Sequence, residues 1–220
     1  MNTTLTMITR DPFCHPWKRA RAVLDEVARR GWPTSLAVDE RSCLSCKRMM
    51  TQYGDPLFFT PAYDSCDGMM NEVVERATTR HCLMISDDEE PSAGVWKLAA
   101  RPGPFSYAFR LLCPLPNGRL YTPGTEIQMR LVERDGWRLV GGIDGWDDTK
   151  RPASSSEIIW HFACFAPRAF RDAKFEGYAR ATGRPANEWE IRHNWEDHLE
   201  LSERMTPELV AQMPRGEVLV

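Results

Sequence analysis

Apolar and polar positions repeat with two different periods along the chain, and the first period is helical. From residue 16 to residue 30 apolar side chains recur every three or four positions, with Pro16 suited to the first helical position and Gly31 just past the end. The apolar positions are Trp17, Ala20, Val23, Leu24, Val27 and Ala28. The pattern predicts an amphipathic helix that packs one face onto a sheet.

Short apolar runs separated by turns continue as far as residue 86. Residues 36–38, 56–60 and 82–85 are typical of strands, and residues 47–53 and 67–78 of helices. The first fifteen residues lack such a pattern, so we expect residues 1–15 to form a flexible N-terminus.

A charged run containing a proline, Asp87-Asp88-Glu89-Glu90-Pro91-Ser92, interrupts this pattern. Breaks of this composition are typical of loops and linkers. The run therefore marks the expected boundary between a small α/β segment at 16–92 and a second part at 93–220. The two parts form either two domains or one domain with a long loop.

After residue 93 apolar and polar positions alternate, with the two-residue period of β-strands. Asn117-Gly118 and Asp135-Gly136 each stand between apolar runs, which is a hairpin signal because both residue types tolerate positive φ. Residues 157–165 are continuously apolar enough for a central strand. These features predict an antiparallel meander with one covered face.

The last quarter of the chain is expected to be helical. Residues 167–182 and 187–204 have helical patterns, and Thr206 with Pro207 begins a third helix as N-cap and first position. The fold class predicted is therefore α+β: an N-terminal segment of helices and short strands, a central antiparallel β-meander, and C-terminal helices.

Composition limits the functions that fit the chain. Apolar residues make up 42% of its 220 residues and the formal net charge is -3. The apolar share supports a real core, whereas the charge argues against a general nucleic-acid coat, which needs excess Lys and Arg. We expect neither membrane insertion nor an export signal, and so a cytoplasmic protein.

The cysteines carry the clearest candidate chemistry. Cys43 and Cys46 form a C-x-x-C pair, whose spacing lets one turn present two thiolates to a metal. With Cys66 and Cys82 they make the predicted structural zinc site. His81, Cys14 and His15 are alternatives to Cys82 as the fourth ligand.

A second interpretation of the same pair is redox chemistry. An apolar strand at residues 36–38, then Cys43-Leu44-Ser45-Cys46, then a helix resembles the active site of thioredoxin-like proteins. The resemblance covers about fifteen residues and implies that Cys43 attacks a disulfide and Cys46 resolves the intermediate. Packing alone is the third interpretation.

Three other candidates lie outside this group. His193, Asp197 and His198 are spaced so that His193 and Asp197 share a helix face, as in some metal hydrolases. His161 is expected to be a hydrogen-bonded core histidine. Cys113 and Cys164 lie in apolar runs and are expected to pack as small hydrophobic residues.

No catalytic set stands out, so the sequence favours a non-enzymatic protein-interaction module. Its eight Trp and its Arg residues are of the types that anchor interfaces. We therefore expect an accessory, inhibitory or regulatory protein of a bacterium, plasmid or phage, with an unidentified protein partner. The alternatives are a thiol-disulfide oxidoreductase that uses Cys43 and Cys46, and a metal-dependent hydrolase or nuclease that uses His193, Asp197 and His198.

Overall fold

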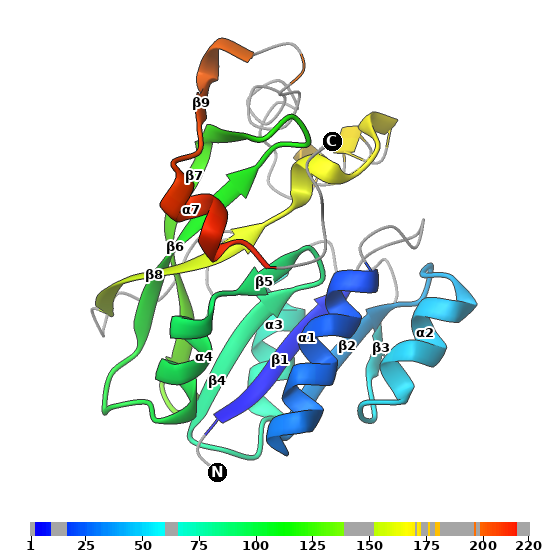
Figure 1. Ribbon diagram of the computed structural model, residues 1–220. Coiled ribbons are helices and arrows are strands. Elements are labelled where there is room, and N and C mark those ends of the chain that lie inside the picture. The colour runs from blue at the N-terminus through cyan, green and yellow to red at the C-terminus, as the bar shows by residue number, and fades with distance from the viewer. Residues whose placement is uncertain are drawn as a thin grey trace.

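A single nine-stranded sheet forms the centre of the protein in the computed structural model (Figure 1). The structure describes residues 3–9, 17–59, 66–138, 152–169, 171–172, 176, 179–180, 196 and 199–214. The strand order is β3-β2-β1-β4-β7-β6-β8-β5, and β9 pairs with β7 off this path. Helices cover the sheet, so the predicted α+β class is confirmed.

The first half of the sheet is parallel. Its strands are β1 (Thr3–Thr9), β2 (Thr34–Asp39), β3 (Leu57–Phe59) and β4 (His81–Ser86). β1 lies between β2 and β4 and is parallel to both, and β3 continues the parallel set beyond β2. Parallel neighbours need crossover connections, which the intervening helices supply.

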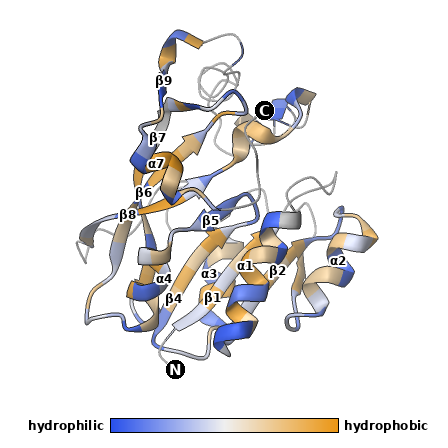
Figure 2. Cartoon of the chain, in the orientation of Figure 1, coloured by the Kyte–Doolittle hydropathy of each residue, from blue (hydrophilic) through white to orange (hydrophobic). Residues whose placement is uncertain are grey.

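The helices pack on both faces of the parallel strands. They are α1 (Trp17–Arg30), α2 (Leu44–Thr51), α3 (Cys66–Glu75) and α4 (Ala93–Ala100). Apolar residues of α1, α2 and α4 share one core cluster with Leu5, Leu36 and Leu83 of the sheet. Residues of α3 pack in separate clusters against the opposite face, with Ala37 and Met84. The parallel half is thus a three-layer α/β/α arrangement, with apolar strands inside and a hydrophilic outer side on α1 (Figure 2).

Residues 3–9 form the middle strand of the parallel half, which differs from the flexible N-terminus expected at 1–15. The segment looks polar because it holds four threonines, yet β-branched threonine suits a strand. Its hydroxyl groups are satisfied inside the protein. Thr3 donates to the Ala99 carbonyl (2.6 Å), and the Thr4 hydroxyl bonds with that of Thr79 (2.8 Å). Hydrogen bonding removes the cost of burying these hydroxyls.

The predicted first helix is confirmed as α1, and its C-terminal signal works as expected. Gly31 has φ of 65°, a conformation that glycine adopts without strain. The Gly31 amide donates to Ala28 and the Trp32 amide to Val27. These two bonds are the Schellman pattern that satisfies the last carbonyls of a helix.

The second half of the sheet is mainly antiparallel. It contains β5 (Glu89–Pro91), β6 (Tyr107–Pro114), β7 (Arg119–Glu133), β8 (Ala153–His161) and β9 (Ser202–Arg204). The predicted Asn117-Gly118 turn connects β6 to its antiparallel partner β7, and Gly118 has φ of 78°. The strand predicted at 157–165 overlaps β8, which lies between β6 and β5. β8 is parallel to β6, so the meander is not purely antiparallel.

The C-terminal residues form fewer helical turns than expected among those described. Thr206 caps α7 (Pro207–Gln212) by accepting from the Leu209 amide, as predicted. Residues 199–204, expected at the end of a helix, form a 3-10 turn at Leu199–Leu201 and then β9, because β7 offers these residues ladder hydrogen bonds. In the helix predicted at 167–182, residues 168–169, 171–172, 176 and 179–180 are helical, and the other positions lie mostly outside the described residues. Residues 187–198 of the helix predicted at 187–204 fall almost entirely outside them.

The sheet crosses the boundary expected near residue 92. β4 pairs with β7 and β5 pairs with β8, so both sides of the acidic run contribute to one sheet. The run itself forms the turn between β4 and β5, the whole of β5, and the N-cap of α4 at Ser92. Among the described residues, no helix is long and apolar enough to cross a membrane.

Candidate functional site at the carboxyl edge of the parallel strands

The chain changes direction across the sheet between β1 and β4. From β1 it proceeds to β2 and β3 on one side, and then returns through α3 to β4 on the other side of β1. In open α/β sheets, ligands bind outside the carboxyl ends of the strands at such a topological switch point. The residues at the carboxyl ends of β1 and β4 are therefore the candidate ligand-binding site.

A direct hydrogen bond joins the two strand ends at this point. Thr9 is the last residue of β1, and Ser86, the last of β4, lies opposite Ile8 in the ladder. The Thr9 hydroxyl donates to Oδ2 of Asp87, the residue after β4, at 2.6 Å. Behind it, Cys46 Sγ lies 3.8 Å from the Thr9 hydroxyl.

Asp87, Asp88, Glu89 and Glu90, here called the acidic turn, each have a described partner. Glu89 is 1% exposed, pairs with Arg130 of β7 and accepts the Ser86 amide at 2.9 Å. Glu90 pairs with Arg19 of α1 at 3.6 Å. With Thr9 of β1 on Asp87 and His161 of β8 on Asp88, the turn is held by side chains from four separate elements of the fold.

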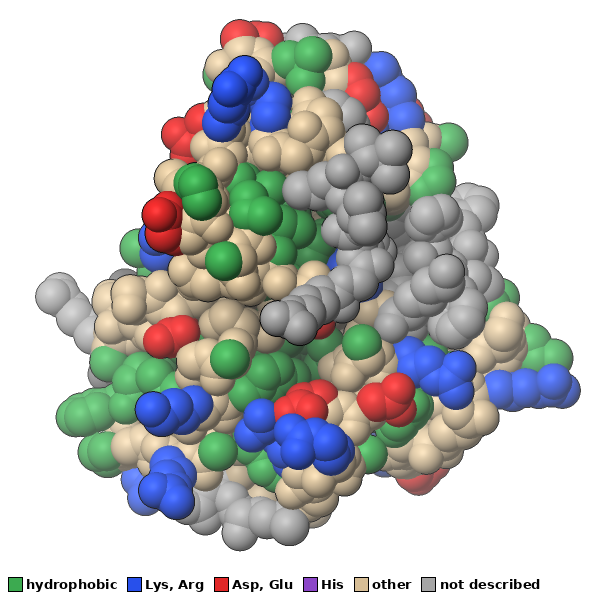
Figure 3. All heavy atoms as spheres, viewed as in Figure 1, with side chains coloured by type: hydrophobic (Ala, Val, Ile, Leu, Met, Phe, Trp, Pro, Cys, Tyr) green, Lys and Arg blue, Asp and Glu red, His purple; other side chains and the backbone are tan. Residues whose placement is uncertain are grey.

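Arg19 fixes the position of α1 beside this turn. Its guanidinium carbon lies 3.3 Å from the centroid of the Phe162 ring, within the range of a cation–π contact. Phe162 in turn donates its amide to the Asp88 carbonyl at 2.8 Å. On the face viewed in Figure 3, basic and acidic side chains lie close together in the lower half, where α1 packs.

A further carboxylate lies at the end of β2, the strand next to β1. Asp39 ends β2 and is 1% exposed. Its Oδ1 accepts the Arg41 amide at 2.8 Å, and the Arg41 guanidinium forms an ion pair with the same carboxylate. An aspartate thus ends β2, and another directly follows β4, on the two sides of β1.

His161 is the titratable partner of the acidic turn. Its Nε2 lies 3.4 Å from Asp88 Oδ2, and its side chain is 21% exposed. Burial alone would lower the pKa of His161, but the negative charge of Asp88 and the hydrogen bond to it outweigh burial and raise that pKa to about 9. The expectation of a hydrogen-bonded histidine fits this contact, in which the imidazolium offsets acidic charge.

Replacing His161 by Asn is expected to make the stability of the protein less dependent on pH. The folded pKa of about 9 exceeds the ordinary value of 6.5, so the pair stabilises the fold fully below pH 6.5. That contribution, on the order of 2 to 3 kcal/mol, is lost as the pH rises through about 9. Urea unfolding of both proteins at several pH values measures it.

Asp88→Asn serves as the control for this prediction, because it removes the same pair from the other side. Both variants should be less stable than wild type at pH 6 and should approach it near pH 9.5. A gap between wild type and His161→Asn that stays constant over this pH range would contradict the assignment.

The C-x-x-C pair lies at the start of α2, close to the candidate site. Cys43 is the N-cap of α2 and its sulfur accepts the Cys46 amide at 3.3 Å. Cys43 is disulfide-bonded, whereas Cys46 is a buried, reduced thiol, so the two are not joined to each other. A strand, a turn and a C-x-x-C at a helix start are present, and the redox role of Cys43 and Cys46 stays a prediction.

Cys82 lies far from Cys46. It belongs to the cluster that packs against α3, whereas Cys46 belongs to the cluster on the opposite face. In the ladder Cys82 lies opposite Thr4, whereas Cys46 contacts Thr9. Thr9 is five residues further along β1 than Thr4, which is about 16 Å in a strand. A zinc ion holds its sulfur ligands at about 2.3 Å, so one ion cannot bind both thiols. Burial also raises the pKa of Cys82 to about 12, which keeps that thiol protonated.

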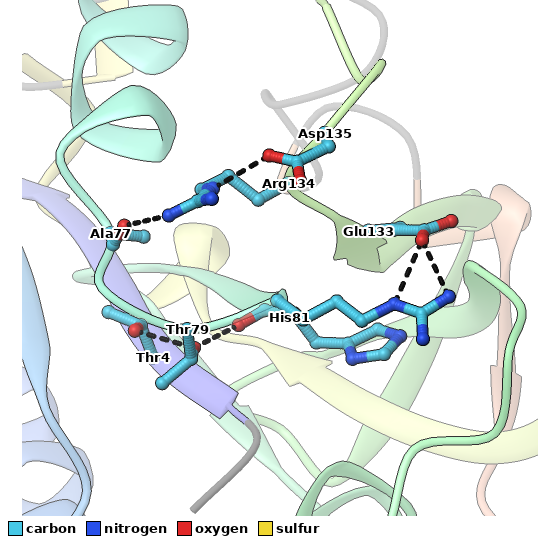
Figure 4. Close-up of polar contacts among 8 residues, drawn as sticks. Thr4, Ala77, Thr79, His81, Glu133, Arg134 and Asp135 are labelled. Carbon is cyan, nitrogen blue, oxygen red and sulfur yellow. Dashed lines mark hydrogen bonds and ion pairs between the residues drawn. The ribbon is translucent and has the colours of Figure 1, made fainter.

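His81, the alternative ligand, lies at the amino end of β4. Figure 4 shows it among polar contacts that tie this end of the sheet together. Thr79 donates to the His81 carbonyl at 2.8 Å, and Arg80 donates to Glu133 at 2.9 Å. This end of the sheet is opposite the candidate site.

The remaining predicted ligands cannot be placed. Cys66 begins α3, but its side chain lies outside the described residues, as do Cys14, His15, His193, Asp197 and His198. In the part of the chain that the structure describes, no three His, Cys, Asp or Glu side chains are grouped to hold a metal ion. The sulfur of Cys43 is already committed to a disulfide. A zinc site that combines Cys46 or Cys82 with cysteines outside the described side chains stays a prediction.

Sequence reasoning treated the acidic turn as a linker and so missed the candidate site. The available signal was that Asp39 directly follows the apolar strand 36–38 and that Asp87 comes two positions after the apolar strand 82–85, with helical segments between the strands. Recognising β1 as a third strand would have completed a β-α-β pattern, which predicts a parallel sheet with its ligands at the carboxyl edge.

Comparison with known proteins gives a weak structural likeness. No protein-family model and no curated protein matches the chain. A crystal structure of residues 1–349 of S. aureus TarS matches with a TM-score of 0.42 and 8% identity, over 96% of this chain and 77% of that one. The same region in complex with UDP-GlcNAc matches with a TM-score of 0.33 and 12% identity, over 52% of this chain and 34% of that one. This chain therefore aligns with about a third of the latter structure's length, and we transfer no residue role from either match.

Proposed function

We propose that the protein is a transferase that binds a nucleoside diphosphate donor, such as a nucleotide sugar, through a divalent cation at the acidic turn. The observation that carries the proposal is the Thr9–Asp87 hydrogen bond, which puts a carboxylate at the switch point between β1 and β4. In sheets of this topology the switch point is where nucleotides bind.

The charge of the acidic turn favours a cation as the link to phosphate. A diphosphate would be repelled by Asp87 and Asp88 unless a cation lay between them. Mg²⁺ and similar hard ions are held in this way, by one or two carboxylates together with substrate phosphates and water. Asp87 and Asp88 are the proposed ligands, with the Thr9 hydroxyl orienting the first and His161 the second.

Asp39 is proposed to bind the nucleoside. It ends β2, the strand next to β1, and accepts hydrogen bonds from the amide and the guanidinium of Arg41. In nucleotide-binding sheets, a carboxylate at the end of the second strand accepts hydrogen bonds from the ribose hydroxyls. The ribose would then lie over β2 and the diphosphate over the β1–β4 junction.

The chemistry follows from where the cation would be. When an acceptor hydroxyl attacks the donor group, the hydroxyl proton passes to water, the bond from that group to the diphosphate breaks, and negative charge develops on the departing phosphate oxygen. Asp87 and Asp88 would hold a cation that could stabilise that charge, as metal ions do in phosphate-leaving reactions. Water as the acceptor would give hydrolysis instead of transfer.

Calorimetric titration with nucleoside diphosphates, in the presence of Mn²⁺ or of EDTA, tests the proposal. We expect at least one of UDP, GDP, ADP and CDP to bind with Mn²⁺ and to bind at least about tenfold more weakly with EDTA. Absence of binding by every nucleotide would overturn the proposal and favour the non-enzymatic interaction module, which stays an untested alternative.

A further inference from the structure

Cys113 and Cys164 are 51 positions apart in the sequence but adjacent in the fold. Their sulfur atoms lie 3.3 Å apart, with Cys113 near the end of β6 and Cys164 in the 3-10 turn η1 (Ala163–Phe165). Both are reduced and almost fully buried, at 3% and 2% exposure. We propose that these two cysteines are a peroxide-reactive dithiol that closes into a disulfide.

The geometry requires little movement. A disulfide has an S–S length of about 2.05 Å, so the sulfur atoms must approach by little more than 1 Å. The thiol of Cys164 hydrogen-bonds with the Cys113 sulfur, and this contact lowers the pKa of Cys113 while that of Cys164 is raised. Cys113 is accordingly the thiol that ionises first and attacks.

The reaction balances with a small peroxide as the oxidant. The Cys113 thiolate attacks one peroxide oxygen, the O–O bond breaks, and the leaving oxygen takes up the proton as water, which leaves a sulfenic acid on Cys113. The Cys164 sulfur then attacks the Cys113 sulfur, the S–O bond breaks, and a second water leaves with the Cys164 proton. The two thiols supply the two electrons that reduce hydrogen peroxide to two waters.

The residues around the two cysteines limit which oxidant can reach them and determine which part of the backbone a disulfide would fix. The pair lies among Leu115, Tyr121 and Leu201, so only a small, uncharged oxidant is suited to reach it. η1 is three residues long, and its local opening offers a route. The amide of Phe162, the residue just before η1, donates a hydrogen bond to the Asp88 carbonyl. A disulfide between Cys164 and Cys113 would therefore tie the backbone next to the acidic turn to β6.

Peroxide titration of the native protein, followed by alkylation, intact mass and peptide mapping, tests this inference. We expect the loss of two hydrogen masses, a peptide cross-link between Cys113 and Cys164, and a higher melting temperature, because closing the loop lowers the entropy of the unfolded chain. The cross-link should be absent in Cys113→Ser and in Cys164→Ser. It should persist in Cys82→Ser, a matched control at another buried thiol.

The inference goes beyond the proposed function and does not need it, since the mass measurement uses no ligand. If a serine variant does not fold, the peptide map of the wild-type protein alone decides. Recovery of Cys113 and Cys164 as alkylated thiols after unfolding, at peroxide doses that already oxidise methionine, would overturn it. So would a cross-link that joins either one to another cysteine.

Discussion

Asp87→Asn is expected to lower the affinity for a nucleoside diphosphate with Mn²⁺ by about 100-fold or more. The change keeps the shape of the side chain and an oxygen that can accept the Thr9 hydroxyl, but it removes a negative charge from the proposed cation site. Affinity measured with EDTA should change little, because only the binding that depends on the cation is lost. Titration calorimetry on both proteins measures the difference.

Asp55→Asn is the matched control for this prediction. Asp55 precedes β3, at the amino end of the parallel strands, and its side chain is 98% exposed. The control should bind as wild type does. Thr9→Val adds an intermediate case, since it removes the hydrogen bond that orients Asp87 but keeps the carboxylate. Equal affinity of wild type and Asp87→Asn would show that the cation binds elsewhere.

Glu89→Gln is expected to destabilise the protein by about 3 to 5 kcal/mol. Glu89 and Arg130 have side chains that are 1% and 15% exposed. Neutralising Glu89 leaves the Arg130 guanidinium buried without its ion-pair partner, and a buried charge without a counter-charge is costly. Urea unfolding without added metal or nucleotide measures the loss directly.

Two further variants separate the ion pair from general damage. Glu75→Gln breaks an ion pair to Arg138 in which both side chains are 67% exposed, so it should cost at most about 1 kcal/mol. The double variant Glu89→Gln with Arg130→Met removes both charges and should be more stable than Glu89→Gln alone. A single variant as stable as wild type would mean that Arg130 is well solvated.

Local signals made part of the fold predictable. The amphipathic pattern and Gly31 defined α1, Asn117-Gly118 defined the turn between β6 and β7, and Thr206 with Pro207 defined the start of α7. Each signal acts over a few residues, through capping or a required φ, so the sequence alone carries it.

The parallel arrangement was not predictable in the same way. β1 looks polar because it holds four threonines. The partners that satisfy their hydroxyl groups, among them Ala99, Thr79, Leu83 and Asp87, lie far along the chain. Because β1 was not predicted as a strand, the strands predicted at 36–38 and 82–85 lacked the neighbour that lies between them and pairs in parallel with both. The acidic turn looked like a linker for the same reason, since Arg19, Arg130 and His161 become its partners only in the folded protein.

The position of a bound cation tests the central claim most directly. Crystals grown or soaked with MnCl₂ and the nucleoside diphosphate that binds best should show an anomalous scattering peak for Mn²⁺ between the Asp87 and Asp88 carboxylates and the diphosphate. The nucleoside should lie toward Asp39, over the end of β2. A nucleotide bound at the amino end of the strands, or a Mn²⁺ peak away from the acidic turn, would contradict the account.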